Sequence, residues 1–211
     1  YDSTGMRTEQ RFATSKDGTR IPYFVVWPQG TKADGKNPTI LYGYGGYQIS
    51  QLPRYNGGYG TAWHARGGVL VIANIRGGGE FGPTWHTSAT KANKQRSYDD
   101  FAAVAEDLIA NKITSPPHLG ISGGSNGGLL VGAVLNQRPE LFGAAVPAVG
   151  VMDMLRYHKF TIGWAWVSDY GSSDNAEEFK ALIKYSPLHT ARRDVAYPPV
   201  LVTTADHDDR V

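Results

Sequence analysis

Short apolar runs recur along the chain and are separated by longer stretches with helical periodicity. The apolar runs are Pro38–Tyr42, Val69–Asn74, His118–Ser122, Ala144–Val149 and Val200–Thr204. Runs this short and this apolar are typical of strands buried on both faces of a parallel sheet. The helical stretches are Ser97–Asn111, Asn126–Gln137 and Ala176–Tyr185. Strands that alternate with helices in this way predict an α/β sheet flanked by helices.

The pattern differs near the N-terminus, where two extended runs follow each other with no helix between them. Glu9–Ser15 and Thr19–Trp27 flank the tripeptide Lys16-Asp17-Gly18. Asp-Gly between extended runs predicts a hairpin, because glycine adopts a positive φ at little cost. We therefore expect an antiparallel edge on a mostly parallel sheet.

Two of the helical stretches begin with recognisable capping residues. Ser97 with Asp100 three residues later has the spacing of a capping box, which predicts that the first helix begins there. Asn175 precedes Glu177 and Glu178, so we expect Asn175 to cap the third helix. Both carboxylates then lie in its first turn, where the helix dipole stabilises negative charge.

Composition narrows the classes of protein to consider. The chain has 211 residues, 41% of them hydrophobic, and a formal net charge of +2. This length fits one domain, and the small charge gives no electrostatic reason to expect a nucleic-acid or membrane partner. No apolar run is long enough to span a bilayer. The absence of cysteine excludes disulfides, thiolate nucleophiles and cysteine-ligated metals.

A glycine-rich turn joins the His118–Ser122 run to the following helix and contains the motif G-x-S-x-G. Its residues are Gly123-Gly124-Ser125-Asn126-Gly127. In a strand–turn–helix context this motif predicts a serine nucleophile on a strained turn, with the Asn126 amide free to donate to an oxyanion. The alternative is a structural or phosphate-binding turn, but no lysine follows the glycines as it would in a P-loop.

A second glycine-rich segment, Gly43-Tyr44-Gly45-Gly46-Tyr47, follows the Pro38–Tyr42 run. Tyr44 could donate its phenol hydrogen to an oxyanion, and an aromatic turn packed on the core is an equally good interpretation.

Acidic residues cluster in Asp206-His207-Asp208-Asp209, after the Val200–Thr204 run. Carboxylates at strand ends face the site crevice of an open α/β sheet, although a solvated turn would have the same composition. Enzymes with a G-x-S-x-G nucleophile on such a turn carry the triad in the order serine, acid, histidine. No histidine follows Asp208 in this sequence. His158 and His189 have no obvious acid partner in the sequence, and a pairing of His207 with Asp153 is a weak alternative.

Several blocks of sequence are together more specific than the serine motif alone. They are Phe12–Thr19, Leu41–Tyr47, Ala73–Gly79, Gly123–Val131, Gln137–Gly143, Gly150–Gly171 and Thr204–Val211. With these blocks the chain resembles the catalytic domain of the prolyl oligopeptidase family over nearly all of its length. The resemblance implies an α/β-hydrolase fold, incomplete at the C-terminus, and a serine endopeptidase that cleaves short peptides after proline through an acyl-enzyme.

The resemblance also implies roles for individual residues. Ser125 matches the nucleophile and Asp208 the acid of the triad, while Tyr44 and the Asn126 amide match the oxyanion donors. The residues that match the substrate-binding pocket are Trp166, which stacks on the proline ring, Tyr170, Val151, Tyr47, Val211 and Arg210, which binds a substrate carbonyl. An aromatic slot suits proline, because its ring is compact and apolar and its peptide nitrogen carries no hydrogen. Without the resemblance, Trp166 and Tyr170 would be interpreted as core aromatics.

The sequence departs from the family in three respects. The propeller domain and the catalytic histidine of the family lie outside residues 1–211, and Tyr47 stands where many members have phenylalanine. The chain also opens at Tyr1 and stops at Val211, so we expect a partial peptidase domain of a longer polypeptide. Alone it should be nearly inactive, because it lacks the general base.

The remaining expectations concern partners and location. We expect short proline-containing peptides as substrates, no metal or organic cofactor, a monomer, and the cytoplasm as the compartment, with the periplasm or secretion as alternatives. A related esterase, a peptidase of different specificity and a non-catalytic peptide-binding module are the competing functions.

Overall fold

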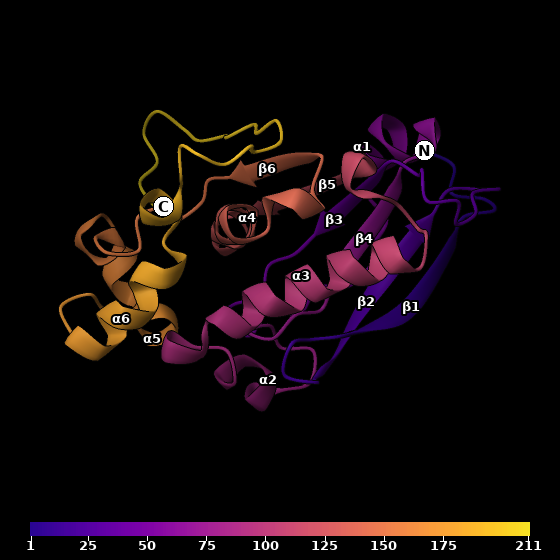
Figure 1. Cartoon of the computed structure of the whole chain (residues 1–211). Coiled ribbons are helices and arrows are strands. Elements are labelled where there is room, and N and C mark those ends of the chain that lie inside the picture. The colour runs from indigo at the N-terminus through magenta and orange to yellow at the C-terminus, as the bar shows by residue number, and fades with distance from the viewer.

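The computed structural model describes all residues from 1 to 211 and contains one mixed sheet flanked by helices (Figure 1). The strands are β1 (Arg7–Thr14), β2 (Arg20–Trp27), β3 (Thr39–Tyr42), β4 (Val69–Ala73), β5 (Leu119–Gly124) and β6 (Ala144–Ala148). Their order is β1-β2-β4-β3-β5-β6. The pairs β1–β2 and β2–β4 are antiparallel, whereas β4, β3, β5 and β6 run parallel. The predicted parallel sheet with an antiparallel edge is confirmed.

Three longer helices and several short ones lie between the strands or follow the last of them. They are α1 (Gly57–Ala62), α2 (Pro83–Thr87), α3 (Gln95–Ala110), α4 (Asn126–Gln137), α5 (Val167–Tyr170), α6 (Ala176–Tyr185) and α7 (Pro187–Thr190). Helix α3 packs on β1 and β2, and α4 packs on β5 and β6. Figure 1 shows α5 and α6 together at the end of the molecule opposite the N-terminus. None of the helices combines the length and the apolar character that a membrane crossing requires.

The core lies between α3, α4 and one face of the sheet. Alternate residues of β2, among them Tyr23 and Trp27, are fully buried on this face, as are Leu41 of β3 and Phe101 of α3. Helix α4 is buried along nearly its whole length, which explains why its sequence is apolar on all sides.

The N-terminal hairpin forms with the predicted turn. Gly18 has a φ of 85°, and the Thr19 amide donates to Asp17 Oδ1 at 3.1 Å. The turn is also tied to the rest of the protein, because Arg76 Nη1 donates to Asp17 Oδ2 at 2.6 Å. The local turn sequence and this long-range ion pair therefore stabilise the same hairpin.

The predicted start of α3 is wrong. The helix begins at Gln95, and Ser97 and Asp100 lie inside it rather than at its cap. Both are buried and bind Arg76, in the loop that follows β4. Ser97 Oγ donates to the Arg76 carbonyl at 2.7 Å, and Asp100 accepts from the Arg76 guanidinium at 2.7 and 2.9 Å. Ser97 and Asp100 therefore serve as hydrogen-bond partners of Arg76 and not as helix caps. The predicted Asn175 cap is confirmed, since its side chain accepts from the Glu177 and Glu178 amides.

The fifth apolar run, Val200–Thr204, does not form a continuous strand. It makes two isolated parallel bridges beside β6, from Val200 to Ala145 and from Thr203 to Ala148. Val200, Leu201 and Val202 are exposed, so the burial that stabilises a central strand is missing. The predicted parallel direction is confirmed by these bridges, whereas the predicted continuous, buried strand is wrong.

Candidate active site

Ser125 lies at the turn between β5 and α4 with a strained backbone. Its φ is 56° and its ψ is −118°, in a region that residues with a side chain seldom adopt. The turn is fixed from both sides, because the Ser125 amide donates to the Ala148 carbonyl at 2.9 Å and the Ser125 carbonyl accepts from the Leu129 amide at 3.1 Å. The serine is therefore fixed between the end of β5 and the first residue of α4.

The glycines around Ser125 allow three backbone segments to approach one another. A Cβ on Gly123 would lie 2.4 Å from the Gly127 carbonyl oxygen, and a Cβ on Gly127 would lie 2.6 Å from the Gly43 carbonyl oxygen. On Gly128 it would lie 2.6 Å from the Ala148 carbonyl oxygen. These distances are below any normal contact, so the predicted need for very small residues here has a direct structural cause.

Tyr44 lies on the loop that follows β3, the strand next to β5. Burial raises the pKa of Tyr44, and the adjacent Ser125 side chain acts in the opposite direction. The phenol therefore remains protonated and able to donate at neutral pH. A protonated phenol beside the serine fits the predicted oxyanion donor better than an aromatic turn that only packs on the core.

Asn126 is buried at 2% exposure and connects two parts of the site through its side chain. Its Nδ2 donates to the Tyr44 carbonyl at 2.5 Å, and its Oδ1 accepts from the Tyr170 phenol at 2.7 Å. The backbone amide of Asn126 begins α4, where the helix dipole favours negative charge. Sequence reasoning assigned a role to this amide alone and missed the side chain.

A pocket of about 190 Å³ brings together part of the predicted substrate-binding set. It is lined by Val151, Trp166 and Val211, and also by Tyr157 and Phe160. Trp166 is half-buried and its ring stacks on Tyr157, at a centroid distance of 6.4 Å and an interplanar angle of 12°. The pocket is thus mainly apolar and aromatic, which suits a compact apolar ring.

The remaining predicted substrate-binding residues do not line this pocket. Tyr170 is buried at 1% exposure behind it, with its ring edge-on to Tyr157 and Tyr47. Tyr47 is partly buried on the loop after Tyr44, and Arg210 is exposed. Trp166 and Tyr170 lie in consecutive helical turns, as their spacing predicted.

Asp208 follows the segment that bridges to β6, at the same sheet edge as Ser125. Gly124, Ala148 and Thr203 lie opposite one another in three neighbouring parallel segments, so the residues that follow each of them emerge at one edge. Asp208 Oδ1 accepts from the Val211 amide at 2.9 Å and the Arg210 amide at 3.0 Å, and these bonds lower the pKa of Asp208. The carboxylate is ionised and partly exposed there.

Each of the six histidines has a partner other than Ser125 or Asp208. Those with acid partners are His86 with Asp169 at 2.7 Å, His158 with Asp174 at 3.1 Å, and His207 with Asp206 at 3.0 Å. The others are His64 with the Gly68 carbonyl, His118 with Ser115 and His189 with Ser186. The expectation that His158 lacks an acid partner is wrong.

The alternative pairing of His207 with Asp153 is also wrong. The His207 side chain is 94% exposed, and Asp153 instead accepts from Arg156 Nε at 2.6 Å. No group of three or more His, Asp or Glu side chains is arranged to hold a metal ion.

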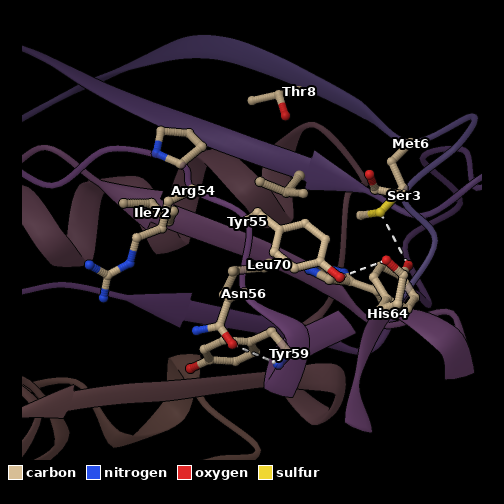
Figure 2. A pocket seen from close by; sticks show the side chains of 13 residues that line it. Ser3, Met6, Thr8, Arg54, Tyr55, Asn56, Tyr59, His64, Leu70 and Ile72 are labelled. Carbon is tan, nitrogen blue, oxygen red and sulfur yellow. Dashed lines mark hydrogen bonds between the residues drawn. The ribbon is translucent and has the colours of Figure 1, made fainter. Parts of the chain in front are cut away.

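A separate pocket of about 340 Å³ lies beside β1, β2 and β4 and contains none of the candidate residues (Figure 2). Three hydrogen bonds link residues of its lining: Tyr1 OH donates to Met6 Sδ, Tyr55 OH to the Tyr1 carbonyl, and the Tyr59 amide to Asn56 Oδ1. Its lining offers no nucleophile with an activating base. The chemistry therefore belongs to the edge of the sheet that carries Ser125.

The mixed sheet, parallel from β4 to β6, and the strained serine between β5 and α4 define the α/β-hydrolase class. Residues 56–211 match the prolyl oligopeptidase family, and the chain belongs to that family. A prolyl endopeptidase of Elizabethkingia meningoseptica is 49% identical over 97% of this chain and 29% of its own length. A solved prolyl endopeptidase structure superposes with a TM-score of 0.95 at 50% identity, covering 98% of this chain and 30% of that one.

Prolyl oligopeptidase B of Galerina marginata is a third relative, with a TM-score of 0.90 and 40% identity over 96% of this chain and 28% of that one. Its substrate-bound structures carry alanine in place of a serine, an aspartate or a histidine. The present chain spans about 29% of the length of the curated relatives it matches.

Proposed function

We propose that this chain is the serine-bearing part of a peptidase that cleaves short peptides after proline through an acyl-enzyme. The observation that carries the proposal is Ser125 at a φ of 56° on the strand-to-helix turn, with the protonated Tyr44 phenol beside it. Family membership supports the same chemistry, as do the prolyl endopeptidases among its relatives.

In the proposed reaction Ser125 Oγ attacks the carbonyl carbon of the proline residue and gives its proton to a histidine oriented by Asp208. Tyr44 OH and the Asn126 amide donate to the oxyanion of the tetrahedral intermediate. The histidine then protonates the leaving amine, and water hydrolyses the ester on Ser125.

We assign the general base to a histidine outside these 211 residues. The six histidines of the chain have other partners, and a histidine is one of three residues replaced in the substrate-bound structures of the Galerina relative. By the same reasoning, residues 1–211 form part of one peptidase domain within a longer protein, a proposal that the length of the relatives supports.

Substrate selection is assigned to the pocket formed with Trp166. The proline ring would stack on the half-exposed indole between Val151 and Val211, and Arg210 would bind a carbonyl of the substrate. Tyr47 and Tyr170 would close the apolar wall behind it, since both rings lie edge-on to one another. No metal or organic cofactor takes part in this mechanism.

Hydrolysis by the protein at its full natural length tests the proposal. A peptide with proline before the scissile bond should be cleaved, its alanine counterpart much more slowly, and Ser125→Ala should abolish both reactions. Cleavage of an aryl ester alone would favour an esterase, and peptide binding without cleavage would favour a non-catalytic module. A fluorophosphonate should label Ser125 in the wild type and leave Ser125→Ala unmodified.

We also propose a monomer located in the cytoplasm. Light scattering on the purified protein and fractionation of its native cells test these two statements separately.

A further inference from the structure

The loop after Tyr44 has a backbone that must be held in place by its surroundings. Tyr47 and Gln48 have φ values of 54° and 58°, although neither is glycine. A residue with a side chain is strained in this region, so such a loop persists only where other contacts determine it. Tyr44, at the start of the loop, is the residue whose phenol must point at Ser125.

Lys94 holds the loop from one side. It precedes α3 and is buried at 1% exposure, and its Nζ donates to the Gly45 carbonyl at 2.7 Å. Two further neighbours favour its charge: the Tyr170 ring, with its centroid 5.7 Å from Nζ, and the carboxylate of Asp169. Burial lowers the pKa of Lys94 to about 8. A buried ammonium group is costly, and its one hydrogen bond goes to this loop.

Asp169 holds the loop from the other side. It lies on α5 at 3% exposure, and its Oδ2 accepts from the Tyr47 amide at 3.1 Å. His86 Nε2 lies 2.7 Å from Asp169 Oδ1, so the second carboxylate oxygen is also bound. The aspartate is thus fixed in direction and binds the amide of a residue whose backbone is strained.

The two buried charges act on the loop as a pair. The cation binds the carbonyl of Gly45, the anion binds the amide of Tyr47, and only Gly46 lies between them. A Cβ on Gly46 would lie 2.6 Å from Asn126 Nδ2, so the middle of the loop is also packed against the residue after Ser125. The arrangement leaves the loop little freedom to move away from the serine.

We propose that Lys94 and Asp169 form a loop clamp, a pair of positioning residues that hold Tyr44 where its phenol can stabilise the oxyanion. The inference rests on the proposed function, because it assumes that Ser125 forms a tetrahedral intermediate. Neither residue touches the substrate. The clamp acts through Tyr44, so its loss should lower kcat rather than weaken substrate binding.

The test compares four variants of the protein at its full natural length. Asp169→Asn and Lys94→Met remove one charge each from the clamp. Their controls are Asp174→Asn, at the surface pair with His158, and Lys180→Met, at the surface pair with Glu177. We expect kcat to fall at least about tenfold in each clamp variant, with KM within about threefold, and both controls to match the wild type.

Each variant is then repeated with Tyr44→Phe. If the clamp acts through the phenol, Asp169→Asn should lower kcat less than about twofold in that background. An equal loss in both backgrounds, or no loss in either, would overturn the proposal. Should Lys94→Met fail to fold, Lys94→Gln keeps a buried donor without the charge and takes its place.

Hydrogen exchange separates failure of the clamp from failure of the proposed function. The Tyr47 amide should exchange at least about tenfold faster in Asp169→Asn than in the wild type or Asp174→Asn. A wild type without any hydrolysis would overturn the proposed function, while unchanged exchange in Asp169→Asn would overturn the clamp whether or not the enzyme is active.

Discussion

The phenol of Tyr170 donates a hydrogen bond to Asn126 Oδ1 at 2.7 Å, in the interior of the protein. Tyr170 belongs to α5, which also carries Asp169 and directly follows Trp166. Asn126 is the residue after Ser125. This one bond therefore joins the helix beside the candidate substrate pocket to the turn that carries the nucleophile.

Removal of that phenol should affect both stability and catalysis. In Tyr170→Phe the buried Asn126 Oδ1 loses its partner, so we expect the free energy of unfolding to fall by about 1–3 kcal/mol. The kcat should fall as well, because Asn126 also fixes the Tyr44 carbonyl. Urea unfolding followed by tryptophan fluorescence and steady-state kinetics measure the two effects.

Tyr55→Phe is the matched control for this substitution. It removes a phenol whose hydrogen bond goes to the Tyr1 carbonyl, on a side chain that is 65% exposed. A loss in Tyr170→Phe no larger than the loss in Tyr55→Phe would mean that the Asn126 bond contributes little.

The ion pair of Arg76 with Asp100 should be the most sensitive charged contact in the domain. The side chains of Arg76 and Asp100 are 6% and 0% exposed, and Asp100 also accepts from Ser15 Oγ at 2.6 Å. Asp100→Ala leaves the buried guanidinium with Asp17 as its remaining charged partner, so we expect a loss of about 3–5 kcal/mol in stability.

Glu106→Ala on the same helix provides the comparison, since Glu106 pairs with Arg138 at 2.8 Å but is 51% exposed. Glu106→Ala should lower the free energy of unfolding by no more than about 1 kcal/mol. Similar urea midpoints for Asp100→Ala and Glu106→Ala would contradict the prediction that the buried pair of Arg76 and Asp100 contributes more to stability than the surface pair.

Local signals in the sequence predicted the elements whose causes are local. Gly18 and Asn175 gave the hairpin turn and the α6 cap, because a positive φ and a free amide need no distant partner. The G-x-S-x-G turn was also predicted from the sequence, since the close approach of neighbouring backbone segments requires glycine at these positions. The strand runs were found because burial on both faces leaves a continuous apolar segment.

What the sequence did not reveal depends on partners far along the chain. Ser97 and Asp100 have the spacing of a cap, but Arg76, more than twenty residues earlier, determines what they bind. The roles of Lys94 and Asp169 were missed for the same reason. A buried lysine before an amphipathic helix looks like an ordinary surface residue until the loop that it binds is known. Its neighbours in the chain carry no signal of that burial.

Stability should rise with pH through the range in which Lys94 loses its proton. Burial lowers the pKa of Lys94 to about 8 in the folded protein, whereas the unfolded side chain keeps the ordinary value near 10.4. Between these values the unfolded chain binds more protons than the folded one. The contribution of Lys94 to stability therefore increases as pH rises above 8, by on the order of 3 kcal/mol by pH 10.4.

The measurement is the difference in unfolding free energy between wild type and Lys94→Met at pH 7.5, 8.5 and 9.5. Taking the difference cancels the opposite effect of the buried tyrosines, such as Tyr185, whose pKa is raised by burial. The unfolding free energy of wild type minus that of Lys94→Met should increase as pH rises, while the corresponding difference for Lys180→Met shows no such trend. A difference that is constant across this range would show that Lys94 does not titrate there.

The packing around Ser125 yields a prediction with a close internal control. In Gly127→Ala the new Cβ would lie 2.6 Å from the Gly43 carbonyl oxygen, and the residue after Gly43 is Tyr44. Backbone cannot move away as a flexible side chain can, so the loop must shift and displace the phenol. We expect a cost of about 1–3 kcal/mol in stability and at least a tenfold slower labelling of Ser125 by a fluorophosphonate.

Gly124→Ala adds the same methyl group three residues earlier, where the nearest heavy atom is the Ala148 carbonyl oxygen at 3.9 Å. This is ordinary van der Waals contact, so the thermal unfolding midpoint should stay close to that of the wild type. Because the two variants add the same methyl group, a difference between them isolates the close approach of the two backbones. If Gly127→Ala folds and labels as well as Gly124→Ala, the turn is looser than its geometry indicates, and the position of Tyr44 does not depend on it.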